Sequence, residues 1–295
     1  MTEETAVIAI DVGGTKILAG LVGRDGKIHS VSRRPTVGQS LLDDICELSN
    51  DVFERARPLG LRVEGIGVAT KGFVDPDRRM LVRSMSMGVE GLRIGDEVEA
   101  RTGLPVFVNN DVHACTKGEM LFGVGRRHRN FLVYNAGTGV SSGIVSDGRL
   151  HVGAGGVAGE VGHMAIAAGN GGKCKCGRNG CLEDLVIRAR DGEAIALADD
   201  SRLDPLPLPY KLLAIGLANL VNVFNPSAVA LVGGMFLNNL EVAERFGPVV
   251  RRLCLVSAAD SLAEIGVTAN GYEAGLIGAG TLPFLAGAGR DTVPG

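Results

Sequence analysis

The sequence predicts an α/β protein built from two related halves. Composition supports this class, because 45% of the 295 residues are hydrophobic and 21% are charged, which is ordinary for a soluble globular enzyme. The 44 glycines and the low aromatic content of 4% favour many tight turns around an aliphatic core. One short apolar strand ends in Asp11-Val-Gly-Gly-Thr15, and a similar strand ends in Asn135-Ala-Gly-Thr-Gly139. This recurrence suggests an internal duplication in which each half opens with a β-hairpin.

The first half is expected to begin with antiparallel strands joined by the glycine turn, and a third strand is expected after Asp25-Gly26. The strand preceding Asn109-Asn110-Asp111 leads into a helix that should start near Val112, with Asp111 at or beside its N-cap. Periodicity predicts strands at 6–12, 17–22, 63–69 and 105–108, and helices at 41–57 and 95–101.

The second half repeats the opening hairpin and then becomes mainly helical. A proline-rich extended linker is expected at 203–209, and the residues after 288 are expected to be frayed. The pattern predicts strands at 131–134, 142–145, 228–232 and 264–269, and helices at 183–198, 210–224, 236–253 and 272–285.

Charge and cysteine usage exclude several classes of function. The net charge of −3 leaves no basic footprint for nucleic acid and no polybasic membrane patch. No apolar run approaches transmembrane length, and the acidic start is unlike a signal peptide. Cys46, Cys115 and Cys254 are scattered and are expected to be buried free thiols, which indicates a reducing, cytoplasmic compartment.

A zinc site is predicted where three cysteines fall close together after a histidine. One imidazole and three thiolates match a closed tetrahedral structural site, and the intervening glycines allow tight turns; the ligands would be His163, Cys174, Cys176 and Cys181. The alternative is a disulfide, but three sulfurs are an odd number, and Cys174 and Cys176 are too close to bridge without strain. A four-ligand site also leaves no position for a catalytic water, which argues against a zinc hydrolase that uses Glu160 as its base.

Two glycine turns at strand ends are candidate phosphate-binding sites, because successive backbone N–H groups can form an anion-binding concavity. They are Gly13-Gly14-Thr15 and Gly137-Thr138-Gly139, and neither has Walker A or Rossmann spacing. Taken alone, each can equally be an ordinary turn. Together with Gly233-Gly234, they suggest a nucleotide held between two lobes.

Several acidic side chains have two possible roles. Asp11 beside the first turn suits Mg²⁺ but can also cap the turn. Asp111 can accept the proton of an attacking hydroxyl, although an N-cap role is the more common one for such a residue. Glu160, His163 and Glu183 bracket the zinc loop and suit sugar hydroxyls, or else they support the metal or lie on the surface.

At this level of detail the chain resembles the ROK-family sugar kinases. The matching motifs, in family order, are Asp11-Val-Gly-Gly-Thr-Lys16, Asn110-Asp111, Gly137-Thr138-Gly139, Gly159-Glu-Val-Gly-His163, the cysteine loop that ends at Glu183, and Leu231-Val-Gly-Gly234. The resemblance covers nearly the whole chain. It implies a two-lobe actin/hexokinase-type, ribonuclease H-like α/β fold with a cleft between lobes 1–111 and 112–295, a zinc loop at 163–181, and a final helix that can pack back on the first lobe.

The resemblance also implies ATP-dependent phosphorylation of a sugar hydroxyl, taken here as O6, with Mg²⁺ at the phosphates and a structural Zn²⁺. Asp111 would be the general base. The sugar contacts would be Gly72, Asn110, Asp111, Glu160, His163 and Glu183. The nucleotide contacts would be Asp11, Gly13, Gly14, Thr15, Lys16, Gly137, Thr138, Gly139, Gly233 and Gly234. The family commonly forms homodimers, and its repressor members carry a DNA-binding segment for which no room is expected before Asp11.

Departures from the family pattern concern the acceptor. Family glucokinases tend to have a Pro-Gly pair where this chain has Thr70-Lys-Gly-Phe73, and a Glu and an Asn where it has Asn109 and His113. The segment Ser84-Met-Ser-Met-Gly88 replaces their acceptor loop. The expected substrate is therefore a hexose or hexose-like sugar, with an amino sugar such as kanosamine, glucosamine or an N-acetylhexosamine, or a cyclitol, as the alternative. A non-catalytic sugar-binding regulator is the remaining rival.

Overall fold

The computed structural model describes residues 4–167, 172–197 and 199–288. Fraying after residue 288, residues 168–171 of the predicted zinc loop, and residue 198 of a predicted helix lie outside the described residues. The chain forms two compact units. The first comprises Met1–Arg126, Arg149–Val157 and Glu273–Gly295, and the second comprises Arg127–Gly148 and Ala158–Tyr272. The lobe boundary between residues 111 and 112 stays a prediction, and each unit is described by its own ranges.

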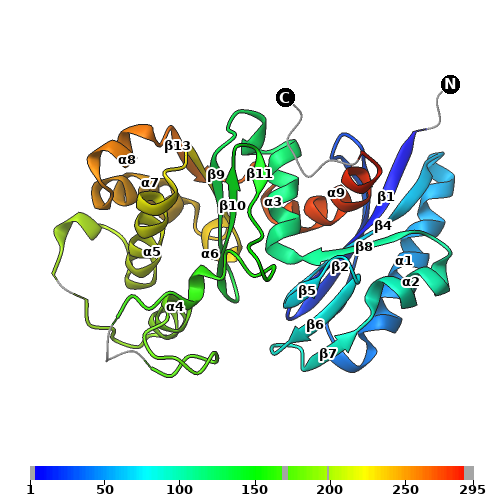
Figure 1. Cartoon of the computed structure of the whole chain (residues 1–295), viewed down its shortest axis with the longest axis horizontal. Helices are drawn as coiled ribbons and strands as arrows, with labels where there is room; N and C mark the ends of the chain where they lie inside the picture. The colour runs from blue at the N-terminus through cyan, green and yellow to red at the C-terminus, as the bar shows by residue number, and fades with distance from the viewer. Residues whose placement is uncertain (1–3, 168–171, 198, 289–295) are drawn as a thin grey trace. The chain divides into compact units, whose positions relative to one another are not determined.

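The first unit is organised around a five-stranded sheet of order β3-β2-β1-β4-β8 (Figure 1). Its strands are β1 (Thr5–Val12), β2 (Lys16–Gly23), β3 (Ile28–Pro35), β4 (Arg62–Thr70) and β8 (Val106–Asn110). The first three are antiparallel neighbours, whereas β4 and β8 run parallel to β1. The carboxyl ends of three parallel strands therefore meet at one edge of the sheet.

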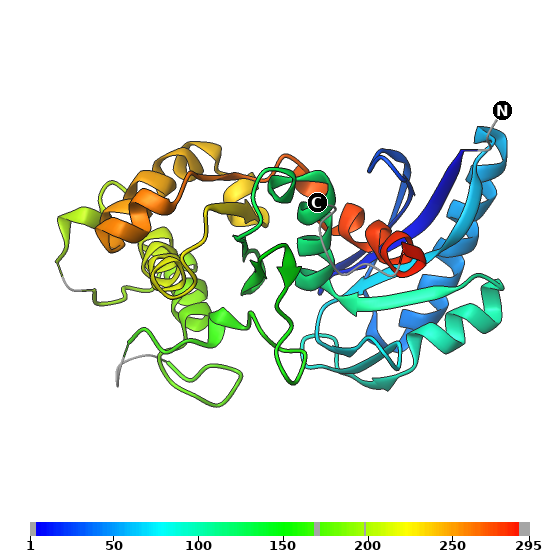
Figure 2. The same ribbon diagram turned by 45° about the horizontal axis from the view of Figure 1, so that its top comes forward.

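Helices cover both faces of this sheet, as Figures 1 and 2 show: α1 (Leu41–Ala56) and α2 (Ile94–Thr102) on one face, α3 (Asp111–Phe122) and α9 (Ala274–Ala288) on the other. Side chains alternate along β1, so Ile8 packs in the cluster with α1 and α2 while Ala9 packs in the cluster with Leu276 of α9. The final helix, α9, thus packs on the sheet of the first unit.

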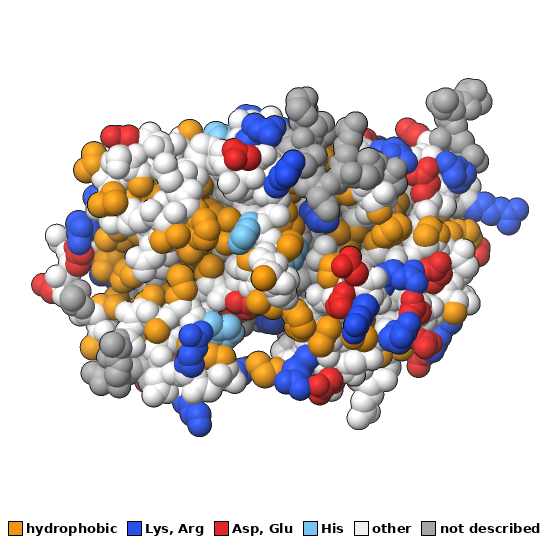
Figure 3. All heavy atoms as spheres, viewed as in Figure 1, with side chains coloured by type: hydrophobic (Ala, Val, Ile, Leu, Met, Phe, Trp, Pro, Cys, Tyr) orange, Lys and Arg blue, Asp and Glu red, His pale blue; other side chains and the backbone are white. Residues whose placement is uncertain are grey.

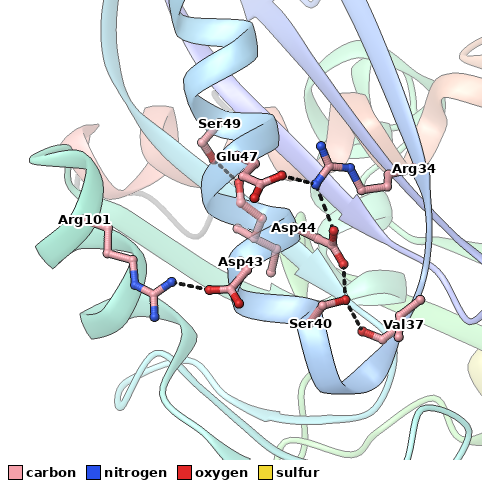
Figure 4. Close-up of polar contacts among 9 residues, drawn as sticks. Arg34, Val37, Ser40, Asp43, Asp44, Glu47, Ser49 and Arg101 are labelled. Carbon is pink, nitrogen blue, oxygen red and sulfur yellow. Dashed lines mark hydrogen bonds and ion pairs between the residues drawn. The ribbon is translucent and has the colours of Figure 1, made fainter.

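Charged side chains fix α1 to its neighbours (Figure 4). The Arg34 guanidinium of β3 donates to Asp44 at 2.9 Å and to Glu47 at 2.6 Å, and Arg101 of α2 donates to Asp43 at 2.6 Å. Burial raises the pKa of Asp44, but the hydrogen bonds from Ser40 and Arg34 outweigh it and hold this pKa below its usual value. In Figure 3, acidic and basic side chains are interspersed on the first unit, in keeping with the small net charge.

Close packing of β4 on α9 requires a glycine. A Cβ at Gly67 would lie 1.9 Å from the Ala279 carbonyl oxygen and 3.0 Å from Pro283 Cδ. We expect Gly67→Ala to destabilise the protein by about 2 kcal/mol or more, because strand and helix must separate to admit the methyl group. Urea unfolding measures this loss. Gly266→Ala is the matched control, since Gly266 is also in a strand and an added Cβ there meets nothing within 4 Å. Equal stability of the two variants would contradict the packing argument.

The second unit contains a sheet in which β10, β9, β12 and β13 are neighbours in this order. The strands are β9 (Phe131–Ala136), β10 (Val140–Ser146), β12 (Ala228–Val232) and β13 (Glu264–Val267). The short β11 (Arg149–Leu150) follows β10 in the chain and belongs to a segment of the first unit. The helices are α4 (Leu182–Arg190), α5 (Leu208–Phe224), α6 (Gly234–Leu237), α7 (Leu240–Leu253) and α8 (Val256–Ser261). The core centres on Phe236, whose ring lies 5.0 Å from that of Phe246.

The two units repeat one strand arrangement. In the first, β1 pairs antiparallel with β2 and parallel with β4; in the second, β9 pairs antiparallel with β10 and parallel with β12. Each hairpin turns through a glycine-containing segment, 13–15 in the first unit and 137–139 in the second. The duplication suggested by the two motifs is therefore present in the strand pairing.

Several predicted boundaries differ from the structure. The helix predicted at 236–253 is interrupted between α6 and α7 at Asn238-Asn239, and α4 ends at Arg190 rather than continuing. The predicted linker at 203–209 overlaps the start of α5 at Leu208. A small antiparallel sheet of β5 (Phe73–Asp75), β6 (Met80–Ser84) and β7 (Val89–Leu92) was not predicted. Short 3₁₀ turns lie at Gly38–Ser40, Arg57–Leu59, Val124–Arg126, Val161–His163, Ser201–Leu203 and Gly271–Glu273. Among the described residues, the helices are too short or too polar to span a membrane.

Candidate functional site

The carboxyl edge of the first sheet brings together residues that are far apart in the sequence. In the strand register, Val12 of β1 lies opposite Thr70 of β4, and Thr70 lies opposite Asn110 of β8. The residues that follow these three strand ends are the glycine turn, Lys71 and Asp111. This edge therefore holds one predicted phosphate-binding turn and the predicted base.

The first glycine turn is closed by backbone and side-chain hydrogen bonds. The Gly13 N–H donates to the Lys16 carbonyl at 3.0 Å, and the Thr36 hydroxyl donates to the Gly13 carbonyl at 2.8 Å. Among the described residues other than its chain neighbours, a Cβ added at Gly14 would meet only Lys71 Cδ, at 4.0 Å. Thr15 and Lys16 are exposed. The turn is thus held in shape from one side and open on the other, as a phosphate-binding turn requires.

Asp111 is the first residue of α3, and Asn110 is the N-cap. The Asn110 side-chain oxygen accepts hydrogen bonds from the Val112 N–H at 2.9 Å and from the His113 N–H at 3.2 Å. The Asp111 carboxylate also accepts from the Val112 N–H, at 3.0 Å. Because the side chain of Asn110 provides the N-cap, the helix does not depend on Asp111 for its capping.

The two carboxylates at this edge ionise less readily than ordinary ones. Burial is the main cause that raises the pKa of Asp11 to about 7; the nearby Asp111 raises it further and Lys16 opposes it. Burial also raises the pKa of Asp111, and Lys71 opposes this shift. Part of the enclosure comes from α9, because a Cβ at Gly275 would lie 2.4 Å from Asp11 Oδ2. Such shifts are typical of functional sites.

Stability should depend on pH through Asp11. An unfolded Asp titrates near pH 4, so between about pH 4 and pH 7 the folded chain holds a proton that the unfolded chain has lost. Stability therefore falls as pH rises through this window, by up to about 1.4 kcal/mol per pH unit. Asp11→Asn, which cannot ionise, should melt at a higher temperature than the ligand-free wild type at pH 8, with a smaller difference at pH 5. A lower melting temperature of Asp11→Asn than of the wild type at pH 8 would show that the folded protein stabilises the ionised Asp11 carboxylate.

Gly72 follows Lys71 in a backbone conformation that only glycine adopts easily. Its φ is +129°, and a Cβ there would lie 2.6 Å from the Arg83 carbonyl oxygen. The Asn110 side-chain amide donates to the Gly72 carbonyl at 3.0 Å. Gly72 and Asn110, both predicted sugar contacts, therefore lie together beside Asp111.

The second unit brings its own glycine turns together. Gly137 donates to the Gly139 carbonyl at 2.9 Å at the end of β9. Gly233 follows the parallel β12 with φ +92°, and a Cβ there would lie 2.4 Å from the Ala136 carbonyl oxygen. A Cβ at Gly137 would meet the Gly234 nitrogen at 3.9 Å. The turns predicted for the phosphates and for the nucleoside are therefore neighbours.

The segment that ends at His163 packs along β10. The backbone N–H of Ser142 donates to the Gly159 carbonyl at 2.8 Å, and the backbone N–H of His163 donates to the Glu160 carbonyl at 3.1 Å. Glu183, at the start of α4, accepts from the Val140 N–H at 2.8 Å, so its carboxylate is anchored to the strand that follows the second glycine turn. Glu160 is exposed, whereas His163 and Glu183 are half-buried.

The predicted zinc ligands converge. The ligand atoms of His163, Cys174, Cys176 and Cys181 all lie within 4.8 Å of one another. His163 Nδ1 is 3.6 Å from Cys174 Sγ, and Cys176 Sγ is 3.6 Å from Cys181 Sγ. These soft donors in a group of this size fit a tetrahedral zinc ion, whose bonds to sulfur and nitrogen are about 2.0–2.3 Å long.

Glycines shape this loop as the sequence predicts. Gly177 and Gly180 have positive φ values of 89° and 75°, and a Cβ at Gly180 would lie 1.9 Å from the Ala167 carbonyl oxygen. Elsewhere, Cys46 and Cys115 are buried free thiols, as expected, whereas Cys254 is only partly buried.

Comparison with known proteins identifies the family. The sequence model of the ROK family matches residues 7–196. The chain belongs to the ROK family. A glucokinase of Streptomyces coelicolor is 30% identical over 311 aligned positions, covering 93% of this chain and 96% of the relative. A xylose repressor of Bacillus subtilis is also 30% identical, covering 76% of this chain and 63% of the repressor.

Solved ROK structures share the fold. A ROK glucokinase from Streptomyces griseus, in complex with glucose and AMPPNP, superposes with a TM-score of 0.78 at 28% identity and covers 94% of this chain and 98% of its own. The predicted α/β actin/hexokinase-type fold is confirmed.

Two residues beside the candidate site at the carboxyl edge of the first sheet were not predicted as functional. Thr36 binds the first glycine turn from β3's far end, and no local motif marks it. Lys71 was noticed only as a departure from the Pro-Gly pair of ROK glucokinases. The available signal was its place immediately after a strand whose neighbours end in Asp11-Val12 and Asn110-Asp111.

Proposed function

We propose that this protein is an ATP-dependent sugar kinase. The observation that carries the proposal is a half-buried carboxylate, Asp111, at the edge of the sheet that also holds the Gly13-Gly14-Thr15 turn, with the helix capped by Asn110. Membership of the ROK family and the likeness to glucokinases support it.

In the proposed reaction, Asp111 accepts the proton of the sugar O6 hydroxyl while this oxygen attacks the γ-phosphorus of ATP. The bond between the γ-phosphorus and the bridging oxygen breaks, and ADP leaves with that oxygen. Burial makes Asp111 a stronger base by raising its pKa, and the Lys71 ammonium opposes this rise.

Mg²⁺, when bound with ATP, neutralises charge on the phosphates. Asp11, a carboxylate directly beside the glycine turn, is the residue that would hold it or its waters. Gly13, Gly14, Thr15 and Lys16 would contact phosphates in the first unit. In the second unit, Gly137, Thr138, Gly139, Gly233 and Gly234 would bind the rest of the nucleotide.

The sugar contacts proposed are Gly72, Asn110, Asp111, Glu160, His163 and Glu183. His163 Nδ1 faces the thiol of Cys174, so the other ring nitrogen is the one we assign to a sugar hydroxyl. The zinc ion would shape this loop without entering the reaction, because three thiolates and one imidazole fill a tetrahedral site. We place the enzyme in the cytoplasm and expect a homodimer.

The test is an ADP-release assay with Mg-ATP against glucose, mannose, fructose, glucosamine, N-acetylglucosamine, N-acetylmannosamine and 3-amino-3-deoxyglucose. Strong turnover of glucose would show that Asn109 and His113, which differ from the Glu and Asn of family glucokinases, do not change the choice of sugar. Preference for an amino or acetamido sugar would indicate that these two positions help to select the substrate.

The rival function is a non-catalytic sugar-binding regulator, which the similarity to the xylose repressor favours. Sugar binding without phosphoryl transfer across the panel, extended to cyclitols, would support the rival and contradict the kinase proposal.

A further inference from the structure

Lys71 occupies a central position at the carboxyl edge of the first sheet. It follows Thr70, which lies between Val12 on one neighbouring strand and Asn110 on the other. Its own N–H donates to the Val12 carbonyl at 3.1 Å, which fixes the start of the side chain beside the glycine turn. The backbone therefore places Lys71 between Gly13-Gly14 on one side and Asp111 on the other.

The side chain of Lys71 extends along this edge. Its Cδ atom lies 4.0 Å from a Cβ built on Gly14, so the aliphatic stem passes the turn. Its charge acts on the Asp111 carboxylate. Lys71 is half-buried, unlike the exposed Lys16 on the far side of the turn. The stem of Lys71 therefore runs past the turn, and the charge at its end acts on the base.

A phosphoryl group in transfer must occupy the region between the turn and the base. It travels from the terminus of ATP at the turn to the hydroxyl held by Asp111, and its charge is spread over three equatorial oxygens. Asp11 and Asp111 are both carboxylates, so a cation of the protein beside them would favour the arrival of an anionic group, in addition to the charge that Mg²⁺ neutralises. Lysine supplies a compact, mobile positive charge suited to phosphate.

We propose that the Lys71 ammonium contacts the γ-phosphoryl group of ATP during its transfer and is a catalytic residue of this enzyme. The proposal deepens the proposed function and rests on it. The contact would offset negative charge on the equatorial oxygens, while the proton of the sugar hydroxyl still goes to Asp111 and the electron pair of the broken bond to ADP.

A second role must be separated from this one. Lys71 opposes the rise in the pKa of Asp111, so its removal should raise that pKa and reduce the fraction of ionised base at neutral pH. Among the described residues, Asp11 and Lys16 are also charged groups at this edge. A loss of activity caused only by this effect would shrink as the pH rises, because a higher pH increases the ionised fraction of the base.

The experiment compares Lys71→Met and Lys71→Arg with Lys27→Met, a control at an exposed lysine in the β2–β3 turn. Lys71→Met should lower kcat about 10²-fold or more at saturating substrates. It should weaken binding of the β,γ-imido analogue of ATP about 10-fold more than binding of ADP, which lacks the γ-phosphoryl group. Lys71→Arg should recover part of kcat, and Lys27→Met should match the wild type.

Three results would overturn the proposal. They are an unchanged kcat in Lys71→Met, equal loss of affinity for both nucleotides, or full recovery of kcat between pH 7 and pH 9. Melting curves show whether each variant folds; Lys71→Gln replaces Lys71→Met if the latter does not. A wild-type protein without phosphoryl transfer would instead refute the proposed function, and the two nucleotide affinities would still report on Lys71.

Discussion

Asp111→Asn is expected to lower kcat about 10³- to 10⁴-fold while leaving sugar affinity within a few-fold of the wild type. The amide cannot accept the hydroxyl proton, yet it has nearly the shape of the carboxylate. The helix should keep its start, because Asn110 holds the N-cap through the N–H groups of Val112 and His113. Steady-state kinetics measure kcat, and calorimetric titration with the sugar identified in the panel measures affinity.

The matched control for this change is Asp77→Asn, an exposed residue of the turn between β5 and β6, which should leave both quantities unchanged. Wild-type turnover in Asp111→Asn would mean that another group is the base. Loss of sugar binding together with a lowered melting temperature would instead assign Asp111 a structural role.

Cys181→Ser is expected to release zinc and lower the melting temperature by about 10 °C, since a structural metal contributes directly to folding. Cys181 is fully buried, and its sulfur lies among the other ligand atoms. It is also the N-cap residue of α4 and pairs with Ala165, so its displacement would loosen the segment that leads to His163. Elemental analysis of the purified variant and a thermal melt provide the two readings.

Cys254→Ser is the control, because Cys254 belongs to the same unit but not to the cluster. It should retain the metal and most of the stability. A Cys181→Ser protein that keeps its zinc would remove Cys181 from the ligand set, and metal loss without any change in melting would mean that the ion is dispensable for folding.

Glycine turns made much of the fold predictable from sequence. The pattern of apolar strand, glycine turn and returning strand identified both hairpins, and their pairing follows it. The β5–β7 sheet was missed because its strands of three to five residues are too short to show an alternating pattern. The break at Asn238-Asn239 lies inside a continuous amphipathic pattern, so periodicity alone could not locate it.

Candidate residues that lie close together in the sequence could be predicted more readily than residues that strand pairing brings together from distant segments. The metal cluster could be expected from ligand type and spacing, and its atoms converge. For Asp111, sequence alone could not separate a cap from a base, since either residue of Asn110-Asp111 can cap; the hydrogen bonds of Asn110 bear on this choice. Lys71 could not be recognised, because its importance depends on strand register between distant segments.

The last helix of the chain has a consequence for biosynthesis. During translation, strands β1 and β4 emerge from the ribosome long before α9, which covers Ala9 and meets Gly67 of their sheet. The part of this face that α9 covers therefore stays exposed while about 200 further residues are made, which leaves apolar surface open to misassociation. Completion of the N-terminal unit must wait for the C-terminal segment, so the order of folding cannot simply follow the order of synthesis.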